Sequence, residues 1–393
     1  MYYLVYHIIQ QVADCEPASP LGQIDAKRSF FMKKNSKPIL LPQSPQPGFD
    51  KPFIEYPFQL ARLDRRGLTI NQSLSGGDAI SLRQHGYYQI INGYGTPFEH
   101  RDKRGEKRYN EGTSFADIYT QYFLDKELGK LLFSKFLDFE EHFKVAIGYS
   151  VSRHFGVNNY RCNDNDNHFP EVKSYLDISF YPGAIAKPIN ELHSISLHCT
   201  KNPTKWYRDN MNHIPPWILL MNATEWQTNS YYLQLPSILK NEILSEMMPP
   251  SITNHLYGSS QEKNDIALFF YSGLELVRGF RNHIAHNIRM YDYQDSIHFL
   301  NITPLVLAGY PNMLKNYEFN KGIGRNDLFA LLIWLFVCSP TPDYRSALLG
   351  DLEAFYSTPA IQKDSNAKYF FHHESKLPLN FITRLEHLTR VIE

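Results

Sequence analysis

The sequence predicts an all-α protein with roughly eight to ten helices and little strand. Two observations support this fold class. Apolar residues recur at helical spacing over long stretches, and residues typical of helix starts and stops flank those stretches. The 393 residues are 43% hydrophobic and 14% aromatic, so the chain can bury a substantial core and is expected to be globular rather than disordered.

The helices are expected in the following order. Residues 56–67 place apolar side chains at helical spacing and end at Gly67, and Asp78 is expected to cap a helix over 78–94. Residues 114–150 carry the longest apolar stripe, spread over one or two helices, and Pro215 and Pro216 start a further helix. The remaining predicted helices cover 230–247 with a break at Pro236, 265 to about 290, 328–338, 343–355 and 380–392, with an extended stretch before 328.

Two segments are expected to be irregular. Residues 99–112 are charged with both signs and show no periodicity, which predicts a surface loop. That loop could be a phosphate-contacting arm, although its acids offset much of its basic charge. Residues 158–182 are polar and aromatic and are expected to form an irregular insertion in the helical domain.

The domain organisation follows from composition. Five prolines between Pro38 and Pro52 forbid a regular helix and predict an extended connector. We therefore expect an N-terminal extension over residues 1–50, a helical domain over 51–345 and a helical C-terminal extension over 346–393.

Charge and cysteine usage limit the function classes. Lys plus Arg equals Asp plus Glu at 40 each, so any contact with RNA must be made by a local group of cations. The four cysteines are widely separated, which favours a reducing, cytoplasmic compartment. The longest apolar run, 328–338, is about half the length of a membrane-spanning helix, so no membrane association is expected.

Metal-ligand patterns are incomplete. Asp164 and Asp166 lack the glycine and the glutamate that a calcium loop needs after them. His193, His198 and Cys199 have no second ligand pair at zinc spacing. The sequence therefore predicts no metal and no cofactor.

The segment RNHIAH, residues 281–286, is the strongest candidate for chemistry. A ribonuclease that works without metal needs a cation for the phosphate and an imidazole for proton transfer, and Arg281 and His286 supply these groups. Similar Arg-to-His spacings occur by chance elsewhere in the chain. A solvated Arg/His face on a packed helix is the plain structural alternative.

The residues of this segment fall on different faces of the predicted helix. Asn282 and His286 lie on a polar face together with Glu275, Arg278 and Arg289, opposite an apolar stripe. Arg281 lies roughly 140° round the helix from His286 if the helix is straight. Either the helix is distorted near Asn282, or a second copy of the chain completes the site.

RNHIAH on a late helix resembles the signature of the HEPN superfamily, and the chain over roughly 50–340 resembles the Abi-D/F abortive-infection family within it. The segments that carry the resemblance are, in order, FQLARLDRRGL, HGYYQIINGY, FADIYTQYFLDKELGKLLFSKFLDFEEHFKVAIGYSVSRHFG, PPWILLMNATEW and LELVRGFRNHIAHNIRMYDY. The resemblance implies a HEPN-like helical bundle and a homodimer. It also implies metal-independent cleavage of cellular RNA, possibly tRNA, by attack of the ribose 2′-hydroxyl.

The same resemblance implies roles for individual residues. Arg281 would hold the phosphate, His286 would act as general acid or base, and Asn282 would orient the cleft. Glu140 matches an acidic position of the family, and Lys144 stands where the family often has Arg. Together with the clustered cations, this predicts further RNA contacts from Arg278, His283, Arg289 and Lys144.

The resemblance also suggests regulation and an alternative. Family members resemble toxin–antitoxin systems, so a small non-coding RNA or a protein antitoxin is the expected inhibitor. The alternative is a HEPN-type protein that binds RNA without cutting it.

Overall fold

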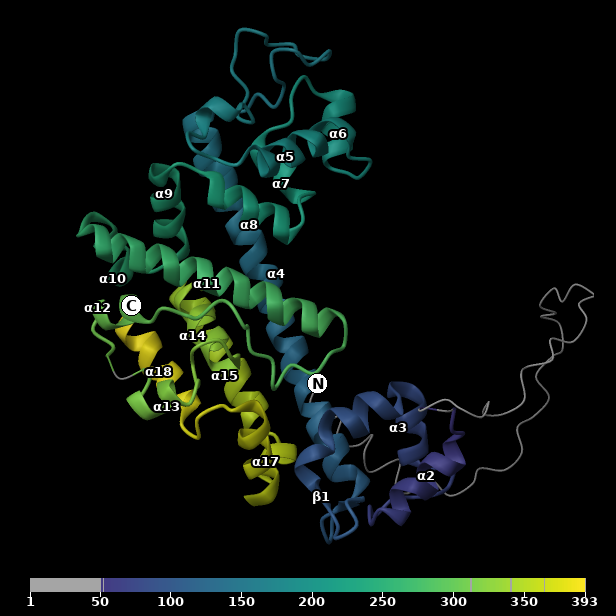
Figure 1. Cartoon of the computed structure of the whole chain (residues 1–393). Coiled ribbons are helices and arrows are strands. Elements are labelled where there is room, and N and C mark those ends of the chain that lie inside the picture. The colour runs from purple at the N-terminus through teal and green to yellow at the C-terminus, as the bar shows by residue number, and fades with distance from the viewer. Residues whose placement is uncertain (1–50, 52, 312, 340, 364, 393) are drawn as a thin grey trace, which may run out of the picture. The chain divides into compact units, whose positions relative to one another are not determined.

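The computed structural model describes residues 51–392 except residues 52, 312, 340 and 364. These residues form helices and one antiparallel hairpin, which confirms the predicted all-α class (Figure 1). The predicted Pro-rich connector lies almost entirely outside the described residues. The chain divides into two units, residues 1–119 and 120–393, and the boundary falls inside helix α4 (Phe115–Phe155).

Among the described residues of the first unit, two short helices come first. In α2 (Tyr56–Arg65), Leu60 and Leu63 are buried, and Gly67 follows with φ 89°, so the predicted stop is confirmed. Helix α3 (Gly77–His85) is shorter than predicted because Gly86 adopts φ 84°, a conformation that ends a helix. A π-helix, η1 (Tyr88–Asn92), and a 3₁₀ turn, η2 (Thr96–Phe98), follow α3.

Asp78 does not cap α3 as predicted. Gly76 is the N-cap, and Asp78 lies in the first turn, where its carboxylate accepts a hydrogen bond from the Asn71 amide at 2.8 Å. The carboxylate therefore joins the helix to the preceding loop.

The prediction of a loop over 99–112 was wrong, because the segment forms a hairpin of β1 (Glu99–Arg101) and β2 (Lys107–Tyr109). The Asp102 side chain accepts hydrogen bonds from the amides of Arg104 and Glu106, and Gly105 supplies a positive φ of 79°. These are the residues that a tight turn needs, and charge patterning does not reveal them.

In the second unit, α4 is one continuous helix. Its buried face carries most of the predicted apolar stripe: Leu124, Leu128, Leu132, Phe136, Phe139, Phe143 and Ile147. Val145, which was assigned to the same stripe, is 56% exposed. A stripe of this length indicates that α4 packs against several neighbours along its axis.

The other helices of this unit follow α4 in chain order. They are α5 (Ala186–His198), α6 (Thr204–Asn210), α7 (Pro216–Met221), α8 (Glu225–Gln234), α9 (Ser237–Met247), α10 (Pro250–Thr253), η4 (Asn254–Tyr257), α11 (Ser260–Ala285), α12 (Thr303–Leu307), α13 (Asn316–Asn320), α14 (Leu328–Val337), α15 (Pro342–Tyr356), α16 (Pro359–Gln362), α17 (Ser365–Ser375) and α18 (Phe381–Ile392). The helices predicted near 328, 343 and 380 are confirmed. Helix α12 interrupts the stretch that was predicted to be extended, and α16 and α17 were not predicted.

Two features fix the position of α11: a capping box at its N-terminus and a close contact with α14. Ser259 and Glu262 exchange hydrogen bonds at its N-terminus, which fixes the start. Gly273 faces the buried indole ring of Trp334 in α14 with no room for a larger residue. This contact fixes the position of the helix that carries RNHIAH.

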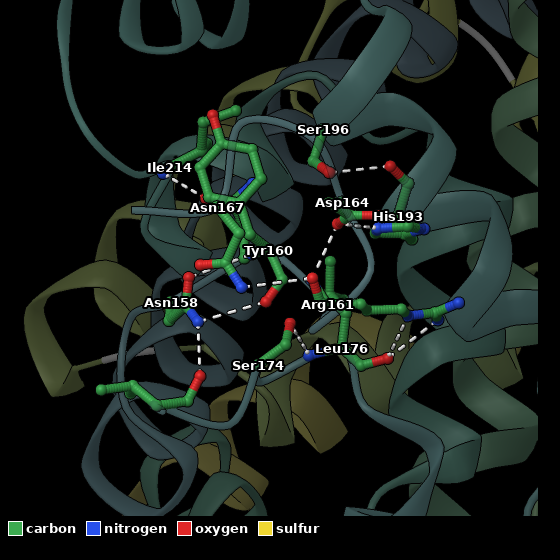
Figure 2. A network of polar contacts seen from close by, with 12 residues as sticks. Asn158, Tyr160, Arg161, Asp164, Asn167, Ser174, Leu176, His193, Ser196 and Ile214 are labelled. Atoms are coloured by element: carbon green, nitrogen blue, oxygen red, sulfur yellow. Dashed lines mark hydrogen bonds and ion pairs between the residues drawn. The ribbon is translucent and has the colours of Figure 1, made fainter. Parts of the chain in front are cut away.

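The insertion over 158–182 is largely irregular, as predicted, apart from the 3₁₀ turn η3 (Ile178–Phe180). Figure 2 shows how polar contacts fix it: the Asp164 carboxylate accepts from the Arg161 amide at 2.7 Å and pairs with His193 Nε2 at 2.8 Å. His193 belongs to α5, so this pair ties the insertion to a helix.

Across the described ranges, no group of three or more His, Cys, Asp or Glu side chains could hold a metal ion. Among the same residues, no helix combines the length and the hydropathy needed to cross a bilayer.

Candidate functional site

RNHIAH lies at the C-terminal end of α11. The helix stays regular through Ala285, and the His286 amide still donates to the Asn282 carbonyl at 3.0 Å. The prediction that the helix continues to about residue 290 was wrong, because Asn287 adopts φ 55° and ends it. Distortion near Asn282, one of the two predicted explanations for the position of Arg281, is therefore not seen.

The chain leaving α11 is firmly held. The Ile288 amide donates to the His283 carbonyl at 2.8 Å, which closes the helix end with a six-residue turn around Asn287. The buried Asp125 carboxylate of α4 then accepts hydrogen bonds from the amides of Met290 at 3.1 Å and Tyr291 at 3.0 Å. His286 thus stands on a rigid turn rather than on a loose loop.

The two histidines of the motif differ in their surroundings. His286 is exposed, and its imidazole has no hydrogen bond or ion pair to any residue that the structure describes. In contrast, Nδ1 of His283 bonds the Gly279 carbonyl at 2.9 Å, and its ring lies 4.0 Å from the ring of Tyr293. His286 is therefore the histidine available to a substrate, whereas His283 is occupied in packing.

Arg281 instead lines a small, mostly apolar pocket that contains two glutamates. It lines a cavity of about 10 Å³ together with Glu140 of α4 and Glu225 of α8, a space that fits roughly one water molecule. Nε of Arg281 lies 3.7 Å from Oε2 of Glu225. The same Nε is buried and makes no hydrogen bond to the described residues, so the guanidinium is only partly satisfied.

Glu225 is the residue of this pocket that sequence reasoning missed. Its pKa is raised to about 7, first by burial and then by the nearby charge of Glu140, while the positive charge of Arg281 acts in the opposite direction. The sequence does mark the start of α8, through the capping box of Thr224 and Gln227. Nothing in it, however, indicates that Glu225 meets Arg281.

The structure brings three of the predicted site residues together. Glu140 and Arg281 line the pocket. Lys144 joins them through Glu140, because its Nζ pairs with Glu140 at 2.7 Å and donates to the Ala223 carbonyl at 2.8 Å. Asn282, which follows Arg281 on the helix, is half-buried. The ammonium of Lys144 is therefore committed to its neighbours.

The remaining predicted RNA-binding arginines are also paired. Arg278 forms an ion pair with Glu275 at 2.6 Å, one turn back on the same helix. Arg289 lies beyond the helix and pairs with Asp292 and with Glu374 of α17. Both arginines have neutralising carboxylates, so neither presents an unbalanced positive charge.

Stability should depend on pH through Glu225. Its ordinary pKa of 4.5 applies in the unfolded chain, so between about pH 4.5 and 7 the folded state holds a proton that the unfolded state has lost. The free energy of unfolding should therefore fall by about 3 kcal/mol as pH rises through this window. In urea titrations at pH 5 and pH 8, Glu225→Gln should remove most of this difference, whereas the exposed Glu171→Gln should leave it unchanged. If the free energy of unfolding fell by the same amount between pH 5 and pH 8 in both variants, the burial of Glu225 would be contradicted.

Fold and site together define an all-α protein that presents an Arg, an Asn and a His at the end of a packed helix. The family model described as Abi-like protein matches residues 81–292, more than half of the chain, and the protein belongs to this family. The match contains RNHIAH but is narrower at both ends than the resemblance over 50–340. No curated protein and no solved structure shows significant similarity to the chain. Membership supports a role in abortive infection, that is, in defence.

Proposed function

We propose that this protein is a metal-independent endoribonuclease of HEPN type that acts in defence by cutting cellular RNA, with tRNA as the candidate substrate. The observation that carries the proposal is the arrangement at the end of α11. The imidazole of His286 is exposed and has no partner among the described residues, and Arg281 lies within one and a half turns of it on the same helix. A protein that used this helix end for packing alone would have no need of an accessible imidazole there.

The proposed chemistry uses side chains of this protein alone. A histidine takes the proton from the ribose 2′-hydroxyl, whose oxygen attacks the adjacent phosphorus. The bond to the 5′-oxygen breaks and that oxygen receives a proton from the protonated histidine, which leaves a 2′,3′-cyclic phosphate and a 5′-hydroxyl and restores the neutral imidazole. Arg281 would stabilise the extra negative charge on the phosphoryl oxygens, and Asn282 would orient the cleft.

The site would be completed by a second copy of the chain. Arg281 faces the Glu225 pocket while His286 faces solvent, and the helix between them is regular. Two residues five positions apart on a regular helix cannot easily reach one phosphate. In a symmetric dimer, His286 of one protomer and Arg281 of its partner could meet across a shared cleft.

A toxic nuclease must be restrained in its own cell. We propose that an antitoxin, either a small non-coding RNA or a protein, holds the enzyme inactive until infection. In this account a structured RNA would be retained without being cut, whereas a protein would cover the exposed imidazole.

Cleavage in the presence of EDTA tests the proposal. Purified protein should cut total RNA under these conditions, and the fragments should end in 2′,3′-cyclic phosphates. The other candidate function is RNA binding without cleavage, and it is favoured by the position of Arg281, which lies beside Glu225 in the pocket rather than beside His286. Intact RNA that is nevertheless bound by the protein would support that function and contradict the nuclease.

A further inference from the structure

A basic groove in the first unit lies apart from RNHIAH in the sequence. Residues of α2 and of the β1–β2 hairpin line a surface groove of about 430 Å³. We define the basic groove by the following side chains: Phe58, Arg62, Arg65, Arg66, Lys107 and Arg108. Glu106 is the one carboxylate in the lining, and two of the five lining cations, Lys107 and Arg108, have carboxylate partners outside it.

Three of these residues form one stripe on α2. Phe58, Arg62 and Arg65 are spaced i, i+4 and i+7, which places them within roughly 60° of one another around the helix. Phe58 is 62% exposed, and both arginines are exposed. A large aromatic ring in solvent, followed by two cations along the same face, is unusual for a helix that only packs.

The hairpin fixes the other wall of the groove. The Tyr109 amide donates to the Arg66 carbonyl at 2.8 Å, and the Arg108 guanidinium donates to the Arg65 carbonyl. Arg108 also pairs with Asp102 at 3.2 Å, and Lys107 pairs with Glu99 on the neighbouring strand. The hairpin is therefore anchored to the end of α2, and the groove is preformed.

The cations of α2 remain unbalanced. Within the described residues, no carboxylate lies within ion-pair distance of Arg62, Arg65 or Arg66. By contrast, Lys144, Arg278 and Arg289, where the sequence placed the RNA contacts, all have carboxylate partners. The unneutralised positive charge thus lies on the groove rather than beside RNHIAH.

We propose that the basic groove binds single-stranded RNA. The guanidinium groups would hold backbone phosphates in two-point contacts, and Phe58 would stack against a base. Glu106 favours RNA over an anionic membrane, because its carboxylate can accept a hydrogen bond from a base N–H, such as N3–H of uracil, and a lipid phosphate offers no such donor. The binding does not require RNHIAH or cleavage, so it can be tested separately from the proposed nuclease activity.

The test is fluorescence anisotropy with a labelled oligouridine of about 12 nucleotides, long enough for one groove and free of secondary structure. The protein is the full chain carrying His286→Ala, so that the probe stays intact. The double variant Arg62→Glu/Arg65→Glu should weaken binding by about tenfold or more. It should also reduce the magnitude of the slope of log affinity against log salt by about 1.4, because two phosphate contacts are lost. The matched control, Lys201→Glu/Lys263→Glu, changes the net charge equally at exposed sites in the second unit and should bind like the parent.

Phe58→Ala separates stacking from charge. It should weaken binding roughly tenfold without changing the salt slope, because no phosphate contact is removed. An equally tight complex with duplex RNA of the same length would overturn the proposal. So would loss of binding in the control pair to the same extent, or binding to phosphatidylserine vesicles but not to oligouridine.

Discussion

Replacing His286 by alanine should reduce RNA cleavage by about 10²- to 10⁴-fold, the usual contribution of a general acid or base. The side chain is exposed and has no partner among the described residues, so its removal should leave the free energy of unfolding unchanged. The measurement is the rate of cleavage of a labelled RNA in EDTA, together with a urea denaturation curve. Induced expression of the variant should no longer arrest growth.

His283→Ala is the matched control, because His283 lies in the same segment, three residues before His286. His283 bonds the Gly279 carbonyl and packs on Tyr293, so this variant should lose stability while it keeps most of its cleavage rate. The reverse pattern, in which His286→Ala still cuts RNA and His283→Ala does not, would show that the wrong histidine has been chosen.

Gly273→Ala should destabilise the fold by about 3 kcal/mol, at the upper end of what overpacking a core usually costs. A methyl group at this position would overlap with the indole ring of Trp334. The ring cannot easily move away, because Phe139 and Phe270 lie against it with ring centroids 4.8 Å and 5.7 Å away. Urea denaturation of the variant against the parent measures the loss.

Gly350→Ala is the control for this substitution. Gly350 lies within α15, and a methyl group there would meet no atom within 4 Å. Alanine is the better helix former by about 0.5 to 1 kcal/mol, so this variant should be slightly more stable than the parent. If both glycine variants were equally stable, the close packing of α11 on α14 would be contradicted.

The helices that the sequence predicted well are those with long apolar stripes. Helices α4 and α11 have apolar residues that recur at helical spacing, and α14 is a continuous apolar run that is buried on all sides. Both patterns are visible without a structure. The helix ends were predicted less accurately, because the backbone conformation of a single residue decides where a helix stops. The positive φ of Asn287 ended α11 five residues early, and that of Gly86 divided a predicted helix.

The site was predictable only where it is local in sequence. Arg281, Asn282 and His286 are neighbours in the chain, so their spacing and helical phase could be read directly. Glu225 joins Arg281 only because α8 packs near α11, and no periodicity records that contact. Likewise, the basic groove depends on a hairpin that was predicted to be a loop, so its cations appeared to be offset by neighbouring acids.

Mixing two inactive variants tests the composite site most directly. Arg281→Gln and His286→Ala protomers, co-expressed with different tags and purified through both, should each be inactive as homodimers. The mixed dimer keeps one Arg281 and one His286 on different protomers, so a shared cleft predicts that cleavage in EDTA returns, to roughly half of the parental rate per dimer. No return of activity in a mixed dimer that forms stably would contradict a site shared between two copies.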